Sequence, residues 1–195
     1  HLALPEEQQY SIKIGAYLHD LGKVSISDAV LHKKSALTDA EFAEIKTHPV
    51  IGFNLIKQHP LGGIAKFIIR HHHERLDGRG YPDCLNEDQL NIGVKIVSIC
   101  DAFDAMTSTR PYRKSMLIEE AIEELNLEKG KQFDGDLLSA FQELCEKGPV
   151  SSIVLHSAND QPLLPCHMCG PTICVNEDDI ANHRTVCRVC GGEYS

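Results

Sequence analysis

Apolar residues recur at short intervals through most of the first 148 positions, a pattern typical of helices packed on a core. Over residues 9–19 this pattern predicts a buried helix that ends at His19 and Asp20, before Gly22 interrupts it. Residues 24–37 are predicted to form a loop with a short turn around Ser27 and Asp28. The His-Asp pair is therefore expected at the end of a helix.

A second helix is predicted to begin at Thr38, because Thr38 and Glu41 have the spacing of a capping box. This helix carries Phe42, Ile45 and His48 at intervals of three, so His48 is predicted to share the apolar face and point inward. A single inward histidine is usually a hydrogen-bonded core residue. Further donors elsewhere in the chain favour a ligand instead.

Residues 61–73 predict a short helix with three consecutive histidines, His71 to His73, at its C-terminal end. Gly78, Gly80 and Pro82 then require a tight loop. Taken alone, a histidine-rich run has two interpretations: a solvated surface patch that binds metal adventitiously, or part of a metal site. Candidate ligands elsewhere in the chain would favour the metal site over the surface patch.

Asn86 is predicted to cap a long helix over residues 87–108. Its apolar stripe runs through Leu90, Val94 and Val97 and continues into Asp101. A buried carboxylate without a partner is costly, and a metal ion is the obvious partner. Histidine and aspartate are donors that divalent zinc, iron or manganese accepts, so Asp101 joins the histidines as a candidate ligand.

Two more amphipathic helices are predicted over residues 118–127 and 136–147, and no strand pattern appears before residue 150. The expected fold of residues 1–148 is therefore an all-α domain. Residues 149–165 contain three prolines and are interpreted as a linker with room for one strand at 153–155.

Residues 166–195 are predicted to form a small zinc-ribbon-like module. The pairs Cys166/Cys169 and Cys187/Cys190 are separated by 17 residues, which is typical of four thiolates around one structural zinc ion. A redox-active Cys-x-x-Cys is the alternative, and two copies of the motif disfavour it. Three further donors in this segment are interpreted as bystanders: His167, Cys174 and His183.

Composition narrows the functional classes. The chain has 195 residues, 42% hydrophobic content and a formal charge of -9. The negative charge argues against non-specific binding of nucleic acid, including by the cysteine-rich segment. No apolar run is long enough to cross a bilayer, and we expect a cytoplasmic protein without a signal peptide. The chain begins at His1 without a methionine, which suggests part of a longer protein.

From about residue 4 to residue 145 the chain resembles HD-GYP domains, a subset of the HD metal-dependent phosphohydrolases. The motifs that carry the resemblance are His19-Asp20-Leu-Gly22-Lys23, Asp28-Ala-Val-Leu31, Leu37-Thr38, His48-Pro49, His72-His73-Glu74-x-x-Asp77-Gly78-x-Gly80-Tyr81-Pro82, Asp101-x-Phe103-Asp104-Ala105 and Ser108-x-Arg110-Pro111-Tyr112. The resemblance implies an HD-type helical bundle with two or three divalent metal ions, iron or manganese, that hydrolyses cyclic di-GMP.

The resemblance also assigns roles to individual residues. Asp20 would bridge two metal ions, with His19 and Asp101 on one ion and His48, His72 and His73 on the other. Lys23 would contact a substrate phosphate, and Arg110 and Arg113 would grip the nucleotide. A further set of residues would orient the histidine ligands or hold the loop that follows them: Glu74, Asp77, Gly78, Gly80, Tyr81 and Pro82. His71 lies outside the family pattern and is interpreted as incidental.

Two departures from the family accompany this resemblance. Ser27 stands where the family usually has proline, and a histidine ligand that the family contributes from an upstream helix has no counterpart before His19. The main hypothesis is a phosphodiesterase in which a metal-bridging hydroxide attacks cyclic di-GMP, or a related cyclic dinucleotide, to give pGpG and in some family members GMP. The alternative is a weakly active or inactive module that senses the dinucleotide or recruits a partner protein. Under either hypothesis, a protein partner or a homodimer is left open.

Overall fold

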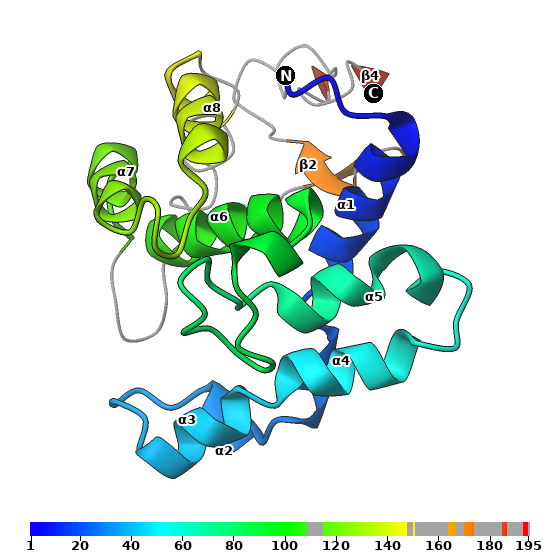
Figure 1. Cartoon of the computed structure of the whole chain (residues 1–195), viewed down its shortest axis with the longest axis vertical. Coiled ribbons are helices and arrows are strands. Elements are labelled where there is room, and N and C mark those ends of the chain that lie inside the picture. The colour runs from blue at the N-terminus through cyan, green and yellow to red at the C-terminus, as the bar shows by residue number, and fades with distance from the viewer. Residues whose placement is uncertain are drawn as a thin grey trace. The chain divides into compact units, whose positions relative to one another are not determined.

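The computed structural model describes residues 1–108, 115–147 and 150, together with the backbone of four short strands (Figure 1). The helices are α1 (Glu6–Leu18), η1 (Leu21–Ser25), α2 (Asp28–Leu31), α3 (Asp39–Ile45), α4 (His48–Ile56), α5 (Gly62–His71), η2 (Glu87–Gln89), α6 (Ile92–Thr107), α7 (Ile118–Leu127) and α8 (Gly135–Glu146), where η denotes a 3-10 helix. The strands are β1 (Leu164–Cys166), β2 (Gly170–Ile173), β3 (Thr185–Val186) and β4 (Glu193–Tyr194).

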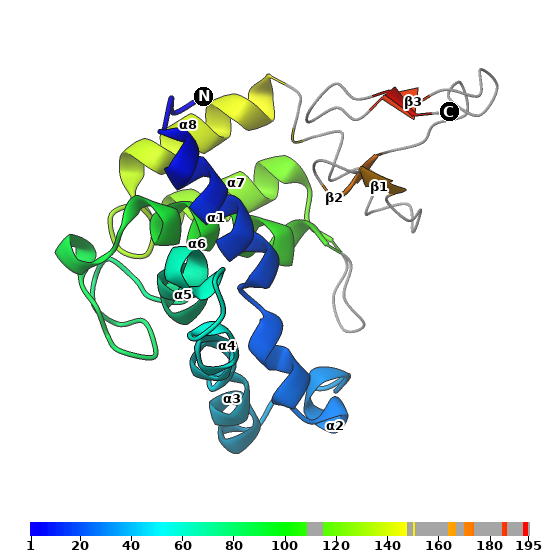
Figure 2. The same ribbon diagram turned by 90° about the vertical axis from the view of Figure 1, so that its right-hand side faces the viewer.

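The chain divides into two units, of which the first comprises residues 1–103 and 123–140. In this unit α5 contacts both α1 and α4 (Figure 2). Two neighbouring residues of α5 enter separate core clusters: Ile68 packs with Val94 and Val97 of α6, while Ile69 packs with Ile56 of α4. Burial of such side chains removes apolar surface from water and fixes the C-terminal end of α5 between its neighbours.

A glycine controls how closely η1 approaches α4. A Cβ atom added at Gly22 would lie 1.9 Å from the backbone oxygen of His48 and 2.6 Å from the nitrogen of Gly52. No other residue fits there without moving the backbone. The contact brings Asp20, at the start of η1, beside His48, at the start of α4.

The predicted helix through His48 is wrong, because the chain forms two helices, α3 and α4, separated at residues 46–47. The cause is Pro49, which lacks the N–H that a continuous helix would donate to the backbone oxygen of Ile45. The ring Nδ1 of His48 occupies that oxygen instead, at 2.7 Å. His48 is buried as predicted, whereas Phe42 is 47% exposed and does not belong to the same buried face.

The predicted helix over residues 87–108 is also two elements. Asn86 caps only η2, Leu90 has extended backbone angles, and α6 begins at Ile92. The side chain of Asn91 accepts a hydrogen bond from the Val94 N–H at 3.0 Å, as an N-cap does, so Asn91 starts the long helix. The Thr38 capping box and the helices near 118–127 and 136–147 are confirmed. Within 24–37 a short helix, α2, replaces the predicted turn.

The second unit comprises residues 104–122 and 141–195. β1 pairs antiparallel with β2, with Cys166 opposite Gly170, and β3 pairs antiparallel with β4. All named strands follow residue 163, so the described part of residues 1–148 is helical as predicted. The side chains of the four predicted zinc ligands and the strand at 153–155 lie outside the described residues, and so does the proposed linker apart from residue 150 and the backbone of Leu164 and Pro165.

Among the described residues, none of the helices has the length and apolar character needed to cross a membrane.

Candidate metal centre

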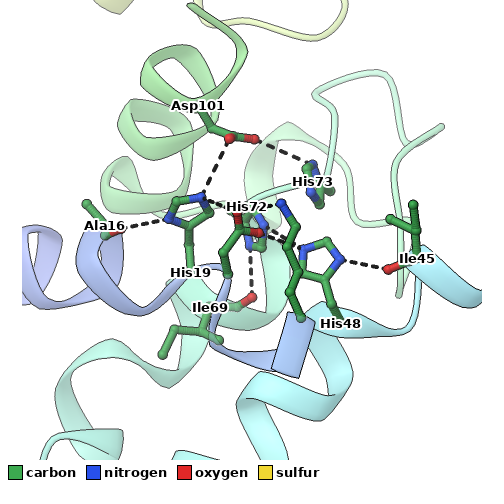
Figure 3. Close-up of polar contacts among 10 residues, drawn as sticks. Ala16, His19, Ile45, His48, Ile69, His72, His73 and Asp101 are labelled. Atoms are coloured by element: carbon green, nitrogen blue, oxygen red, sulfur yellow. Dashed lines mark hydrogen bonds and ion pairs between the residues drawn. The ribbon is translucent and has the colours of Figure 1, made fainter. Parts of the chain in front are cut away.

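The candidate ligands gather from helix ends that lie far apart in the sequence (Figure 3). His19 is the residue after α1, His48 is the first residue of α4, and His72 follows α5. Asp101 comes from within α6 and faces these ends. Helix packing therefore brings together the donors that the sequence could only mark one by one.

Three histidine rings are oriented in the same way. In His19, His48 and His72 the ring Nδ1 lies 2.7, 2.7 and 2.9 Å from the backbone oxygen three residues earlier. These oxygens belong to the last turns of α1, α3 and α5, where backbone carbonyls lack helical partners. A carbonyl oxygen can only accept, so Nδ1 carries the proton and Nε2 of the neutral ring has a free lone pair. A carbonyl partner on the other ring nitrogen is usual for metal-bound histidine.

Two ring nitrogens that face each other support a cation beside them. Nε2 of His48 and Nε2 of His72 are 3.2 Å apart. Both Nδ1 atoms donate to carbonyls, so two lone pairs face each other in a buried place, which is unfavourable unless a positive charge lies beside them. The residues present thus fit a metal ion by their own geometry.

The donor atoms form two groups of three, and within each group they lie within 4.8 Å of one another. One group is His48, His72 and His73, and the other is His19, His72 and Asp101. His72 belongs to both. Imidazole and carboxylate donors in this number suit iron, manganese or zinc.

Asp20 extends across the two groups. One carboxylate oxygen lies 3.3 Å from Nε2 of His48, and the other lies 3.3 Å from Nε2 of His19. The second oxygen also accepts a hydrogen bond from Lys23 Nζ at 2.5 Å. Asp101 behaves similarly, with one oxygen 3.5 Å from Nε2 of His19 and the other 3.9 Å from Nδ1 of His73.

Electrostatics keeps most of these rings neutral. Burial lowers the pKa of His72 to about 2 and that of His73 to about 4, and it also lowers the pKa of His48. For His19, burial lowers the pKa, but hydrogen bonds with Asp101 and Asp20 outweigh it and raise the pKa to about 10. A divalent cation at this position would displace the His19 proton, because a metal-bound imidazole has to be neutral.

The loop after the histidines is fixed by a buried acid. Glu74 is 1% exposed and accepts hydrogen bonds from the backbone N–H groups of Asp83 at 2.7 Å and Leu85 at 3.0 Å. A Cβ atom at Gly80 would lie 2.4 Å from Cα of Glu74, so only glycine lets the loop pass this closely. Glu74 therefore holds the loop, which is one of the two roles that the family resemblance implied.

The loop places an aromatic ring on one of the candidate ligands. The ring of Tyr81 stacks on that of His73, with centroids 4.8 Å apart and planes inclined by 28°. The peptide between Tyr81 and Pro82 is cis, and Gly78 has a φ of 72°. Asp77 accepts hydrogen bonds from the Arg75 side chain. These residues shape the loop and leave the ring nitrogens of His73 to the donor cluster.

His71 is an anchor and not an incidental residue, a function that sequence reasoning missed. Its Nδ1 lies 2.9 Å from the backbone oxygen of Phe67, and its Nε2 lies 2.9 Å from a carboxylate oxygen of Asp83. Arg70 donates two further hydrogen bonds to Asp83, at 2.7 and 2.8 Å. With both ring nitrogens engaged, His71 has no donor left for a metal. The twelve-residue separation from Asp83 gave no sequence signal for this pairing.

The predicted substrate contacts are described only in part. Lys23 lies within hydrogen-bond distance of Asp20, beside the donor groups. Arg110 and Arg113 lie outside the described residues.

Taken together, the fold and the cluster define a helical domain whose donors could hold divalent metal ions. The sequence profile described as "HD domain" matches residues 1–137, and the chain belongs to this family.

Several curated relatives are similar over the same region. The chain is 39% identical over 135 residues to the cyclic di-GMP phosphodiesterase response regulator RpfG of Xanthomonas campestris, covering 68% of this chain and 36% of that protein. It is 40% identical over 135 residues to a cyclic di-GMP phosphodiesterase of Thermotoga maritima, covering 68% of this chain and 37% of that protein. A 3'3'-cGAMP-specific phosphodiesterase of Vibrio cholerae is 37% identical over 142 residues, covering 72% of this chain and 27% of that protein. The chain thus spans between 27% and 37% of the length of these relatives.

Solved structures share the fold. The cyclic GMP-AMP specific phosphodiesterase V-cGAP3 of Vibrio cholerae has a TM-score of 0.58 at 17% identity, covering 78% of this chain and 42% of that one. Bd1817, an HDG"Y"P protein from Bdellovibrio bacteriovorus, has a TM-score of 0.56 at 19% identity, covering 70% and 43%. These likenesses establish the HD-type helical fold.

Proposed function

We propose that this domain is a metal-dependent phosphodiesterase that hydrolyses cyclic di-GMP or a related cyclic dinucleotide. The observation that carries the proposal is the pair of donor groups that share His72 and are spanned by Asp20. Two-metal sites of this kind are typical of enzymes that cleave phosphate esters. The names of the relatives, phosphodiesterases of cyclic di-GMP and of 3'3'-cGAMP, supply the substrate class.

We assign His19 and Asp101 to one ion, and His48, His72 and His73 to the other, with Asp20 as the bridging carboxylate. The grouping of the donor atoms supports this division, with His72 facing both groups. The two oxygens of Asp20, each 3.3 Å from a different histidine, support the bridging role. Iron or manganese suits a site of imidazoles and carboxylates without thiolates.

Divalent cations held in this way would supply Lewis acidity and lower the pKa of bound water to near neutrality. The protein contributes the rest. The backbone carbonyls behind His19, His48 and His72 orient the rings and fix their tautomers. Lys23 places an ammonium beside Asp20, where it could offset the negative charge of a phosphate. Arg110 and Arg113 remain predicted nucleotide contacts.

Hydrolysis of cyclic di-GMP tests the proposal. The full chain, reconstituted with Mn²⁺ or with Fe²⁺ without oxygen, is expected to convert cyclic di-GMP to pGpG, and separation of the nucleotides measures the product. Asp20→Ala is the inactive control. Saturable binding of cyclic di-GMP without product would contradict the enzyme and favour the sensing module.

For residues 166–195 we propose a structural zinc ion held by Cys166, Cys169, Cys187 and Cys190. Supporting this, β1 ends at Cys166 and β2 begins directly after Cys169, while β3 ends directly before Cys187 and β4 begins at Glu193, shortly after Cys190. Each pair thus falls between two paired antiparallel strands, as in a zinc knuckle. Cys187→Ser should remove one zinc per chain in elemental analysis, and Cys174→Ser should not. Equal zinc content in both variants would refute the assignment.

A further inference from the structure

A lysine at the edge of the donor cluster has no acidic partner among the residues that the structure describes. Lys46 follows α3 and is exposed. The two nearby glutamates of α3 are engaged elsewhere: Glu41 pairs with Lys33, and Glu44 accepts a hydrogen bond from the Ser27 N–H. Across residues 1–108 and 115–147, no carboxylate lies within ion-pair distance of the Lys46 ammonium. Lys23, which also lies beside the cluster, is by contrast paired with Asp20.

Aromatic rings hold the ammonium in place. Nζ of Lys46 lies 4.6 Å from the centre of the Phe42 ring and 5.3 Å from the centre of the Tyr81 ring. Both distances are within the range of cation–π attraction. Phe42 is 47% exposed, so a large apolar ring that could have been buried remains at the surface under this cation.

The same tyrosine ties Lys46 to the candidate metal ligands. The Tyr81 ring stacks on His73 at 4.8 Å, and His73 is a member of one donor group. The unpaired ammonium is therefore separated from the donor cluster by one aromatic ring. An anion bound at the cluster that extends past Tyr81 would meet this charge.

A cyclic dinucleotide is an anion that can extend from the donor cluster past Tyr81. It contains two phosphodiesters in one covalent ring, so when one phosphate is at the reacting position, the other is held a short distance away and needs a counter-charge. A lysine supplies a compact positive charge with three donors for such a phosphate.

We propose that Lys46, positioned by Phe42 and Tyr81, holds the second, non-reacting phosphate of the cyclic dinucleotide. The proposal rests on the proposed function of the site and deepens it. It assigns to α3 a role in recognising a substrate that carries two phosphates.

The test compares substrates with two phosphates and one. For the Mn²⁺-loaded full chain, Lys46→Gln should raise the KM for cyclic di-GMP on the order of tenfold, with kcat changed less than about twofold. The KM for bis(p-nitrophenyl) phosphate, which has one phosphate, should change by less than about twofold. Lys46→Arg should retain most of the affinity. Lys66→Gln, at another exposed lysine, is the matched control.

Equal changes in KM for both substrates, or no change for either, would overturn the assignment. A wild-type chain that hydrolyses neither substrate refutes the proposed function, and equilibrium dialysis with cyclic di-GMP then decides the role of Lys46 separately. In dialysis, Lys46→Gln has to weaken binding relative to Lys66→Gln. Absence of binding to the wild-type chain, or equal binding to both variants, refutes the inference as well.

Discussion

Two adjacent histidines at the C-terminal end of α5 differ in their roles: His71 anchors the loop, and His72 is a candidate metal ligand. His71 and His72 are both buried, and each directs Nδ1 to a backbone oxygen of its own helix. They differ in what Nε2 faces: a carboxylate of Asp83 for His71 and the lone pair of another imidazole for His72. The comparison teaches that burial and a hydrogen bond from Nδ1 to a backbone oxygen do not separate a structural histidine from a ligand. The partner beyond Nε2 does.

The largest effect should follow from replacing His72 and not His71. His72→Ala removes a donor from both groups, so cyclic di-GMP hydrolysis should fall by about a thousandfold or more, because metal ions supply several kcal/mol of transition-state stabilisation. His71→Ala should keep its metal content and lose stability instead. Elemental analysis and turnover of the two variants, side by side, measure the difference. Loss of metal from His71→Ala alone would reverse the comparison.

The next largest effect should come from the anchoring of the loop by Glu74. Glu74→Ala leaves the N–H groups of Asp83 and Leu85 without their acceptors in a buried place, which should lower the free energy of unfolding by about 3 kcal/mol. Glu74→Gln, which retains one acceptor oxygen, should lose less. Urea unfolding with the metal removed measures both. Stabilities of both variants equal to that of the wild type would show that the carboxylate does not hold the loop.

The Asp83 anchor should depend on pH. Hydrogen bonds from Arg70 and His71 lower the pKa of Asp83 to about 2, so the stabilisation is present above the ordinary value near 4 and is lost as pH falls toward 2. Because Asp83 is partly exposed, Asp83→Asn should cost about 1 kcal/mol at pH 7.

Urea unfolding at pH 7 and near pH 3 tests this dependence. The difference between wild type and Asp83→Asn should shrink toward the lower pH. A constant difference would mean that the carboxylate charge contributes nothing to the anchor.

The smallest effect should come from the backbone of the same loop. Cys84 has a φ of 53°, a left-handed conformation that costs most residues about 1 kcal/mol. Cys84→Gly should therefore raise the free energy of unfolding by up to about 1 kcal/mol, less the added freedom of the unfolded chain. Ala3→Gly is the control, since Ala3 has a similar φ near the chain terminus, where a gain is not expected. Destabilisation by Cys84→Gly would indicate that its thiol matters more than its backbone.

Helices and candidate ligands were accessible from the sequence because each depends on local signals, such as the Thr38 capping box or the histidine run. Both errors in the helices arose where a local rule was outweighed by another one nearby. Pro49 split the helix that the spacing of Phe42, Ile45 and His48 predicted, and Asn91 took over the cap expected at Asn86.

The anchors of the loop could not be predicted in the same way. Arg70, His71 and Asp83 meet only after the chain has turned back on itself, and their spacing follows no helical or strand period. The placement of Lys46 between Phe42 and Tyr81 likewise depends on tertiary packing. Sequence patterns identify donors, whereas three-dimensional contacts decide which of them remain free for a ligand.

The most direct test of the central claim is anomalous X-ray scattering from crystals of the full chain loaded with Mn²⁺. We expect two anomalous peaks, one in contact with Nε2 of His48 and one with Nε2 of His19 and a carboxylate oxygen of Asp101, with Asp20 between them. Absence of a peak among these donors, with the Nε2 atoms of His48 and His72 still in contact, would contradict the account.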